Sequence, residues 1–241
     1  MEDPRKYGKS SGGKSLRELF NSIAERYDLT NRLISLGLDK LWRRKACEEV
    51  LKFVEGNNLK ILDVACGTGD MMLCMKKRLE KRNLSAEFYG LDCSEEMLKL
   101  ARRKVPFAKL TVGTAEEMPY PDESFDVVSV AFGLRNFSNR EKAIGEIGRV
   151  LKPGGKLVVL EFSRSNSFLG RLAWIYTKSV VPLIGAFITG NRKAYEHLVS
   201  SISSFPSPEK LAEEFEGEGF KVMSLRWLLP RIAFILVLER L

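Results

Sequence analysis

A glycine-rich turn joins an apolar run to a helical stretch in the first third of the chain. The run Leu62-Asp63-Val64-Ala65-Cys66 leads into Gly67-Thr68-Gly69. Glycine has no Cβ atom, so this turn lets a ligand approach the backbone closely. The N-terminus of the following helix favours negatively charged groups such as a carboxylate. The pattern predicts a nucleotide-type binding site, with a tight turn that binds nothing as the alternative interpretation.

An acidic residue further along the chain supports this prediction. Asp92 ends the run Gly90-Leu91-Asp92, roughly 20 residues after the turn, where a carboxylate can accept hydrogen bonds from both ribose hydroxyls. Capping of the next helix is the alternative role. A dinucleotide site needs a third small residue where this chain has Met72, whose long side chain argues against NAD.

Short strands and helices alternate around these residues and must position them. Runs rich in β-branched, aromatic or leucyl residues predict strands at 60–65, 86–92, 109–112, 126–131 and 156–162. Helices are expected at 71–81, at 95–104 with Ser94 as N-cap, and at 140–151. A helix at 208–216 and strands at 220–227 and 232–238 follow. The fold class predicted is α/β: a doubly wound, mostly parallel seven-stranded sheet with a C-terminal antiparallel hairpin.

The length and composition predict one folded domain. Residues 1–14 are basic and rich in glycine and serine, and we expect a flexible arm there. The remainder, 15–241, forms a single domain, with a helical cap at 15–55 that breaks near Gly37 and a helical lid or insert at 163–205. The four cysteines form no C-x-x-C pair and His197 is the only histidine, so no metal site is expected. A reduced cytoplasmic compartment fits this cysteine pattern.

Several motifs resemble those of known enzymes. The pattern from Asp63 to Asp70, the acidic strand end at Asp92, the turn Thr114-Ala115-Glu116 and the run 149–155 resemble class I methyltransferases, which have a Rossmann-like fold. Three further motifs resemble the menaquinone/ubiquinone biosynthesis C-methyltransferase family. They are Phe20-Asn21-x-Ile23-Ala24-x-x-Tyr27-Asp28-x-x-Asn31 with Ser35-x-Gly37 and Trp42-Arg43, then Phe132-Gly133-Leu134-Arg135-Asn136, and Leu160-Glu161-Phe162-Ser163.

The resemblance implies a cofactor and an acceptor. The cofactor is S-adenosyl-L-methionine, and the acceptor is a lipophilic reduced quinone that is methylated at a ring carbon. Thr68 and Asp92 are implied to contact the cofactor, with Thr114 and Ala115 beside the adenine. The full set of residues predicted to bind the cofactor is Asp63, Gly67, Thr68, Gly69, Asp92, Cys93, Met97, Thr114, Ala115 and Ala131.

Four residues are predicted to act in catalysis. Arg135 and Asn136 lie in the loop after the fourth strand, beyond which ligands bind in open α/β sheets. Arginine is a poor proton acceptor, so Arg135 is expected to stabilise a developing phenolate or to orient a water molecule. Tyr27 and Asn31 share one helix face, which we expect to close over the acceptor. The alternatives are a surface ion pair for Arg135, and packing of Tyr27 with Asp28 capping the next helix.

The chain departs from the family pattern at three places. Thr114 stands where asparagine or aspartate is usual, and Ala131 replaces a serine before the Phe-Gly-Leu-Arg-Asn motif. Leu229-Pro230-Arg231 replaces a glycine-rich turn before the last strand. The first two changes concern cofactor affinity, and the third leaves the identity of the acceptor open.

The segment 163–193 combines apolar and aromatic residues with five basic residues and no acidic one. This composition suits a helix that lies on anionic lipid, and a lid that packs on the sheet or lines a pocket for an isoprenoid tail is the alternative. A membrane-spanning helix is not expected, because Pro182 interrupts the longest uncharged stretch. We therefore expect a cytoplasmic protein, with contact at the inner face of the membrane left open.

The charge and the motifs also bear on alternative functions. The net charge of +8 also fits nucleic acid, but methyltransferases of exocyclic amines usually carry an N/D-P-P-Y/F/W element that Phe132-Gly133-Leu134-Arg135 lacks. No nucleic-acid partner is therefore expected. A non-enzymatic membrane scaffold, an O- or N-methyltransferase of another small lipophilic molecule, and a homodimer are left open by the sequence.

Overall fold

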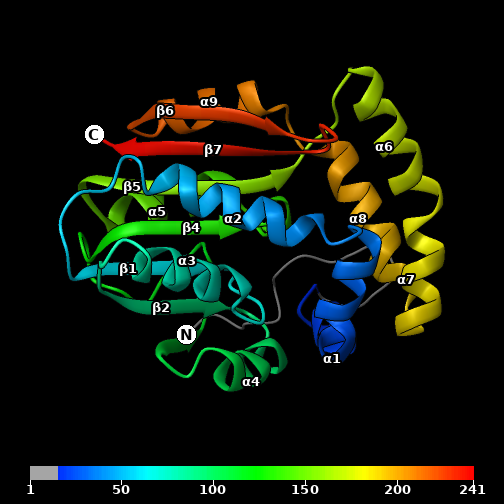
Figure 1. Ribbon diagram of the computed structural model, residues 1–241, viewed down its shortest axis with the longest axis horizontal. Coiled ribbons are helices and arrows are strands. Elements are labelled where there is room, and N and C mark those ends of the chain that lie inside the picture. Colours follow the sequence, from blue (N-terminus) through cyan, green and yellow to red (C-terminus); the bar gives the residue numbers. More distant parts are fainter. Residues whose placement is uncertain (1–15) are drawn as a thin grey trace.

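The computed structural model describes residues 16–241, and the arm expected at 1–14 lies outside them. The strands are β1 (Leu59–Val64), β2 (Ala86–Asp92), β3 (Ala108–Val112), β4 (Phe125–Ala131), β5 (Leu151–Phe162), β6 (Phe220–Leu228) and β7 (Ala233–Arg240). They form one sheet in the order β3-β2-β1-β4-β5-β7-β6 (Figure 1). Strands β1 to β5 run parallel, and β7 pairs antiparallel with β5 and β6. The predicted fold class is confirmed.

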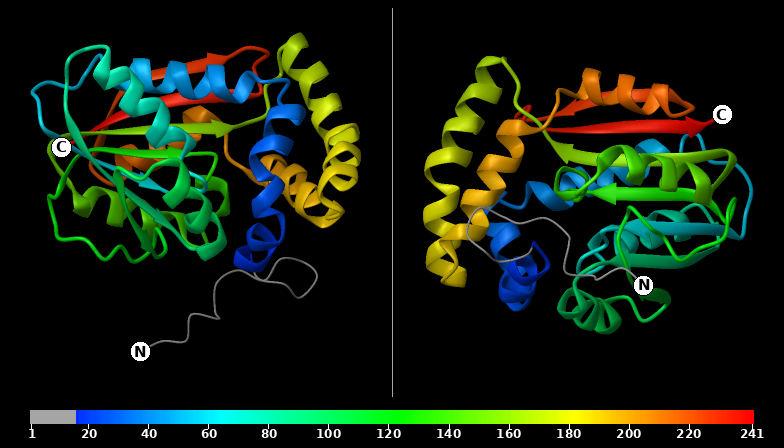
Figure 2. Two further views of the ribbon diagram at one scale, coloured as in Figure 1. Left: turned by 60° about the horizontal axis from the view of Figure 1, so that its bottom comes forward. Right: turned by 180° about the vertical axis from the view of Figure 1, so that it is seen from behind.

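Helices cover both faces of this sheet. The helices α2 (Leu38–Val50), α3 (Asp70–Glu80) and α4 (Glu95–Lys104) share one hydrophobic core with the sheet. The helices α5 (Arg140–Val150) and α9 (Pro208–Gly217) share the core on the opposite face. Figure 2 shows these two layers in a tilted view and from behind. The Ser94 hydroxyl accepts the Met97 N–H at 3.2 Å, which confirms the predicted N-cap.

A separate group of helices lies beyond the carboxyl ends of the parallel strands, on the right in Figure 1. It comprises α1 (Leu16–Ile34), α6 (Phe168–Ser179), α7 (Val181–Thr189) and α8 (Arg192–Ser204). A small core of its own, which includes Leu19, Ile23, Val181 and Tyr195, joins α1, α7 and α8. Within the segment expected to form a cap, α2 packs on the sheet through Trp42, and α1 alone reaches over the strand ends.

The start of one strand differs from the sequence prediction. Strand β5 begins at Leu151, which pairs with Phe125 before the register shifts at the Pro153-Gly154-Gly155 turn. The helical segment Phe168–Thr189 is long and apolar enough, by length and composition alone, to cross a membrane. The expected interruption is nevertheless present, because α6 ends at Ser179 and α7 begins at Val181, with Pro182 in its first turn.

The position of Met72 shows how α3 packs without a third glycine. Met72 is almost fully buried. A Cβ atom built on Gly90 of β2 would lie 2.9 Å from the Met72 methyl group. Gly90 of β2 therefore leaves the space for the Met72 side chain, so α3 can pack on the sheet without a glycine at position 72.

Candidate active site

The turn after β1 presents part of its backbone to open space. Ala65, Gly67 and Gly69 have positive φ values of 54°, 53° and 87°. A Cβ atom on Gly69 would lie 2.7 Å from Val105 at the end of α4, whereas one on Gly67 would meet nothing within 4 Å. Gly69 thus allows the turn to pack closely against α4, and Gly67 leaves room for a ligand above the backbone.

Asp92 at the end of β2 holds this turn in place. Its Oδ2 accepts the Gly67 N–H and its Oδ1 accepts the Ser94 N–H, both at 2.8 Å. Burial raises the pKa of Asp92, and these two donors only partly oppose the effect. A carboxylate has about four lone-pair sites, so it can accept two more donors. A pair of ribose hydroxyls fits this remaining capacity.

Asp63 of β1 lies deeper than the rest of the predicted cofactor site. It is buried, and the Ser129 hydroxyl donates to its Oδ1 at 2.6 Å. Burial raises the pKa of Asp63 to about 7, although the Ser129 hydrogen bond and the positive charge of Arg43 act in the opposite direction. Asp63 therefore links β1 to β4 beneath the predicted cofactor site.

The other predicted cofactor residues lie near the carboxyl ends of neighbouring strands. Thr114 and Ala115 follow β3, and Ala131 is the last residue of β4. Cys93 follows β2, and burial raises the pKa of its thiol to about 12, so it stays protonated. Met97 is buried in α4. The ten predicted residues thus lie at or near the carboxyl ends of the parallel strands.

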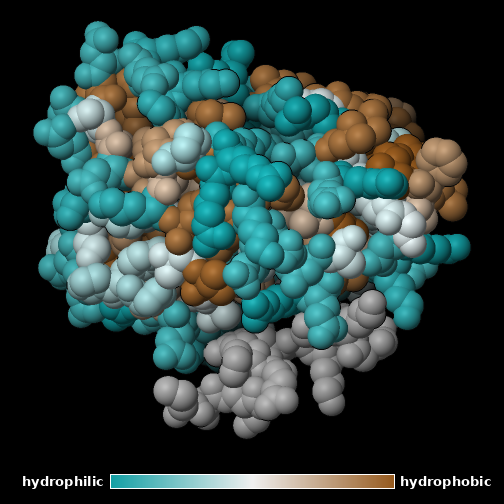
Figure 3. All heavy atoms as spheres, turned by 90° about the horizontal axis from the view of Figure 1, so that it is seen from below, coloured by the Kyte–Doolittle hydropathy of each residue, from teal (hydrophilic) through white to brown (hydrophobic). Residues whose placement is uncertain are grey.

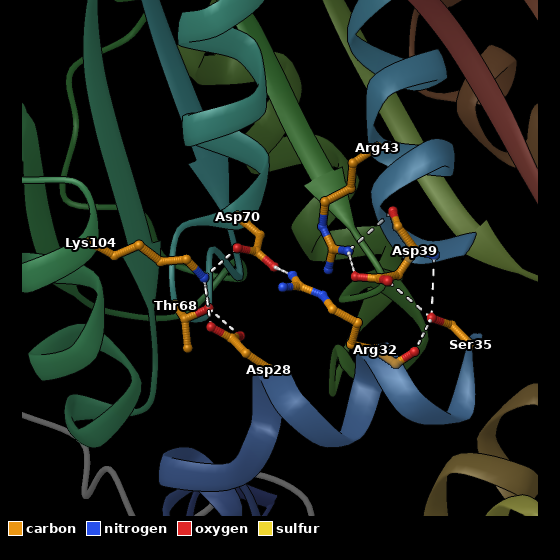
Figure 4. A network of polar contacts seen from close by, with 8 residues as sticks. All are labelled: Asp28, Arg32, Ser35, Asp39, Arg43, Thr68, Asp70 and Lys104. Carbon is orange, nitrogen blue, oxygen red and sulfur yellow. Dashed lines mark hydrogen bonds and ion pairs between the residues drawn. The ribbon is translucent and has the colours of Figure 1, made fainter. Parts of the chain in front are cut away.

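A polar network ties α1 to the cofactor turn (Figure 4). The Thr68 hydroxyl donates to Asp28 Oδ1 at 2.7 Å, and Lys104 Nζ donates to Asp28 Oδ2 at 2.6 Å and to Thr68 Oγ1 at 3.0 Å. Lys104 also pairs with Asp70, which lies 3.8 Å from Arg32. Asp28 lies inside α1, so the alternative in which it caps the next helix is wrong.

Lys104 is the one ammonium that contacts both Asp28 and Asp70 within the described part of the chain. Replacing Lys104 by methionine leaves these carboxylates without that shared partner, and we expect local opening of α1 to become easier by about 1 kcal/mol. Hydrogen exchange in α1 should accelerate about fivefold. The matched control is Arg103→Met, at an exposed neighbouring position. Equal exchange rates in both variants would show that the network does not hold α1.

A cavity of about 680 Å³, its open mouth included, lies between α1, α2, α8 and the ends of β4 and β5. The four residues predicted to act in catalysis, Arg135, Asn136, Tyr27 and Asn31, all line it. Most of the wall is apolar or aromatic, and the rings of Phe132 and Phe162 stack there with centroids 4.5 Å apart.

Arg135 belongs to a buried ion pair on one side of this cavity. It lies in the short helix η2 (Leu134–Asn136), and its Nη1 is 2.7 Å from Glu161 Oε1. Glu161 is completely buried and also accepts the backbone N–H groups of Arg135 and Phe162. The Arg135 Nε atom is buried without a hydrogen-bond partner among residues 16–241. The alternative of a surface ion pair for Arg135 is therefore wrong.

His197 of α8 lines the same cavity. Its Nε2 lies 3.1 Å from Asn136 Oδ1, and with the amide assigned in this orientation the neutral ring donates from Nε2, which leaves Nδ1 as its acceptor nitrogen. Burial, together with the positive charge of Arg135, lowers the pKa of His197 below its usual 6.5. The imidazole is therefore neutral at pH 7 and can accept a proton.

A second charged pair, from α2, also lines the cavity. Arg43 Nη1 donates to Asp39 Oδ2 at 3.0 Å, and the Ser35 hydroxyl donates to Asp39 Oδ1 at 3.0 Å. The Arg43 guanidinium lies 5.2 Å from the centre of the Phe132 ring. Arg43 thus lies on the cavity wall, and its charge also lowers the pKa of Asp63.

His197, Asp39, Arg43 and Glu161 were not predicted to have a role. Arg43 and Glu161 belong to motifs that resemble the family, and this position could have identified them. His197 carried no such signal, because it lies about 60 residues from Arg135 and reaches the cavity only through the packing of α8. The three positions 229–231, which depart from the family pattern, are not part of the cavity wall.

Comparison with known proteins shows the family of the chain. Residues 9–233 match the ubiE/COQ5 methyltransferase family. A demethylmenaquinone methyltransferase of Deinococcus radiodurans is 43% identical over 218 residues, which cover 88% of each chain. The protein of the same name from Thermus thermophilus is 44% identical over 209 residues, covering 85% of this chain and 92% of the relative.

Solved structures show the same fold at lower identity. A S-adenosylmethionine-dependent methyltransferase from Thermotoga maritima, described as a possible histamine N-methyltransferase, superposes with a TM-score of 0.63 at 22% identity and covers 92% of this chain and 98% of its own. The C-methyltransferase domain of the citrinin polyketide synthase gives a TM-score of 0.65 at 20% identity, covering 93% and 59%. The family match spans nearly the whole described domain, and the chain belongs to the ubiE/COQ5 methyltransferase family, whose members are S-adenosylmethionine-dependent enzymes.

Proposed function

We propose that this enzyme methylates a ring carbon of a reduced polyprenyl quinone of the demethylmenaquinol type. The two relatives described above are named for an acceptor of this class. One observation in the structure carries the proposal: an apolar, aromatic cavity contains a buried arginine and a neutral histidine, and Tyr27 on its wall precedes the Asp28 that contacts Thr68 of the cofactor turn. A planar hydroquinone ring matches the apolar wall, and its two hydroxyl groups need polar partners.

The cofactor supplies an electrophilic methyl group, so the protein has to orient the acceptor and raise the electron density at its ring carbon. Loss of the hydroxyl proton next to that carbon achieves this. His197 Nδ1 takes this proton, while Asn136 orients the imidazole through Nε2. Arg135 stabilises the negative charge that develops on the phenolate oxygen.

The proposed reaction balances without any further reactant. The ring carbon forms a bond to the methyl group as the carbon–sulfur bond breaks, and the electron pair of that bond stays on sulfur. The ring carbon then loses its own proton to water, which restores the aromatic hydroquinone. The proton held by His197 returns to the phenolate oxygen. No oxidant or reductant is consumed.

The direct test uses the purified chain, S-adenosylmethionine and a prenylated naphthohydroquinone with one free ring carbon. We expect a product heavier by one CH₂ unit, with the methyl group on carbon as located by NMR, and no product from the oxidised quinone. An O-methyl ether would instead support a different lipophilic acceptor chemistry. Cofactor binding with no product from any hydroquinone would overturn the proposed acceptor class and leave the methyltransferase assignment intact.

The role of His197 predicts a specific pH dependence. Because its pKa is lowered below 6.5, the base is active at neutral pH, and kcat should fall only as the pH decreases through this lowered value. The other ionisable groups that line the cavity are Tyr27, Asp39, Arg43, Arg135 and Tyr195, and none of the three acids among them supplies a free base there. Asp39 is paired with Arg43, and burial raises the pKa of both tyrosines.

His197→Gln should lower kcat by about a hundredfold or more and remove the acidic limb of the profile. The control is Glu196→Gln, an exposed residue on the same helix outside the cavity. A variant that keeps the acidic limb, or that changes KM alone, would show that His197 only shapes the cavity.

A further inference from the structure

The outer surface of α6 and α7 carries large apolar side chains that no other part of residues 16–241 covers. Phe168, Leu172 and Ile175 on α6, with Leu183 and Phe187 on α7, are 50% to 92% exposed. Their spacing within each helix is three or four residues, so they form one stripe on each helix. We call these five side chains the α6–α7 face. Figure 3 shows hydrophobic residues gathered at its right-hand edge, the side on which these two helices lie.

Positive charge accompanies this apolar surface. Arg164, Arg171 and Lys178 flank α6 or stand within it, and no acidic residue occurs between 163 and 195. All three side chains are exposed. The Arg164 guanidinium lies 5.1 Å from the centre of the Trp174 ring. An apolar stripe bordered by cations and an aromatic ring matches the boundary between lipid headgroups and acyl chains.

The α6–α7 face is separate from the acceptor cavity. No residue of α6 or α7 lines that cavity, whose helical walls come from α1, α2 and α8. The alternative in which this segment lines the pocket is therefore not what the structure shows. The inner side of α7 is packed tightly, because a Cβ atom on Gly185 would lie 2.3 Å from the Tyr195 ring.

We propose that the α6–α7 face docks on the surface of a bilayer that contains anionic lipid. Charge complementarity selects this occupant. A second copy of the chain on a two-fold axis would bring the same cations against one another without an acidic partner. This inference goes beyond the proposed function, because it concerns where the enzyme binds rather than what it methylates.

The face lies on the bilayer and does not cross it. Lys178 stands near the middle of the apolar segment Phe168–Thr189, so a spanning arrangement would place an ammonium group at the centre of the hydrocarbon. Spanning would also pull α7 away from Tyr195. In the docked arrangement the basic side chains reach the headgroups while the stripe enters the acyl boundary.

The test is flotation of the purified full chain with vesicles of phosphatidylcholine alone and of phosphatidylcholine mixed with phosphatidylglycerol. We expect binding to the mixed vesicles that weakens as salt is added. Phe187→Ser and Leu183→Ser should each reduce this binding about tenfold, because an exposed apolar side chain no longer enters the interface. The matched control is Leu241→Ser, since Leu241 is 72% exposed at the far end of β7.

A charge-reversal series tests the electrostatic part. Arg171→Glu with Lys178→Glu should reduce binding to the mixed vesicles by tenfold or more, whereas Lys210→Glu on α9 should have no effect. Binding of the wild type to neither vesicle, or equal loss in Leu241→Ser, would overturn the proposal. A dimer that Phe187→Ser converts to a monomer would assign the face to a second copy instead. Vesicle binding needs no methyl transfer, so failure of the proposed acceptor would leave this result unaffected.

Discussion

Arg135→Leu should lower kcat by a hundredfold or more and lower the free energy of unfolding by about 3–5 kcal/mol. Both effects follow from the position of Arg135 against Glu161, whose carboxylate is completely buried. Without the guanidinium, this charge keeps only its two backbone N–H donors. The developing phenolate in the proposed reaction also loses its cation, so kcat should fall by a hundredfold or more. Thermal or urea unfolding and steady-state kinetics measure the two effects separately.

A double variant distinguishes these two roles of Arg135. Arg135→Leu combined with Glu161→Leu removes both charges, and replacing a buried ion pair with apolar residues often restores stability. We expect the double variant to regain most of the lost stability and none of the turnover. The conservative substitution Arg135→Lys should retain part of the stability and part of the turnover. If the double variant regains turnover together with stability, Arg135 has a structural role only.

The strands and the cofactor turn could be predicted because each depends on local sequence. The β-branched runs gave strand positions within one or two residues for β1 to β4, and glycine at 67 and 69 marks a turn that needs positive φ. The start of β5 at Leu151 was missed because a proline and two glycines usually end a strand. Here they form an irregularity that the pairing of Leu151 with Phe125 tolerates.

The cavity could be predicted only in part, because its walls come from distant segments. Tyr27, Asn31, Arg135 and Asn136 were found through motifs, and all four meet in the cavity. His197 was not found, since a single histidine on a helix shows nothing about its surroundings until α8 is placed beside η2. Likewise, the amphipathic pattern of α2 shows that it has a buried face, but not that this face packs on the sheet.

The position of Asp92 makes cofactor affinity sensitive to one carboxylate. Asp92→Ala removes the acceptor that we predict for the ribose hydroxyls, and it frees the Gly67 and Ser94 N–H groups that shape the turn. We expect the affinity for S-adenosylmethionine, measured by calorimetry, to fall at least about tenfold, which corresponds to ~1.4 kcal/mol. The loss of a charge-assisted contact and the loss of the turn geometry both lower this affinity.

Asp126 offers a control for the loss of the turn geometry, because it lies at the amino ends of the parallel strands, far from the predicted cofactor site. Asp126 Oδ2 accepts the Lys60 N–H at 2.7 Å, so it also holds a backbone amide, but it lies at the start of β4. Asp126→Ala should destabilise the fold without changing cofactor affinity. If both variants weaken binding equally, general destabilisation explains the loss, and Asp92 has no direct contact with the cofactor.

The raised pKa of Asp92 predicts that cofactor affinity depends on pH. The direction of this dependence distinguishes a direct contact with the cofactor from a purely structural role of Asp92. Burial raises this pKa, so the free enzyme takes up a proton here at a higher pH than an exposed aspartate would. Cofactor affinity should fall as the pH decreases through that raised value, because the protonated acid accepts fewer hydrogen bonds. Hydroxyl donors from the cofactor favour the carboxylate, so binding under mildly acidic conditions should release a proton. Calorimetry in buffers of different ionisation enthalpy measures this release, and Asp92→Ala should lack it.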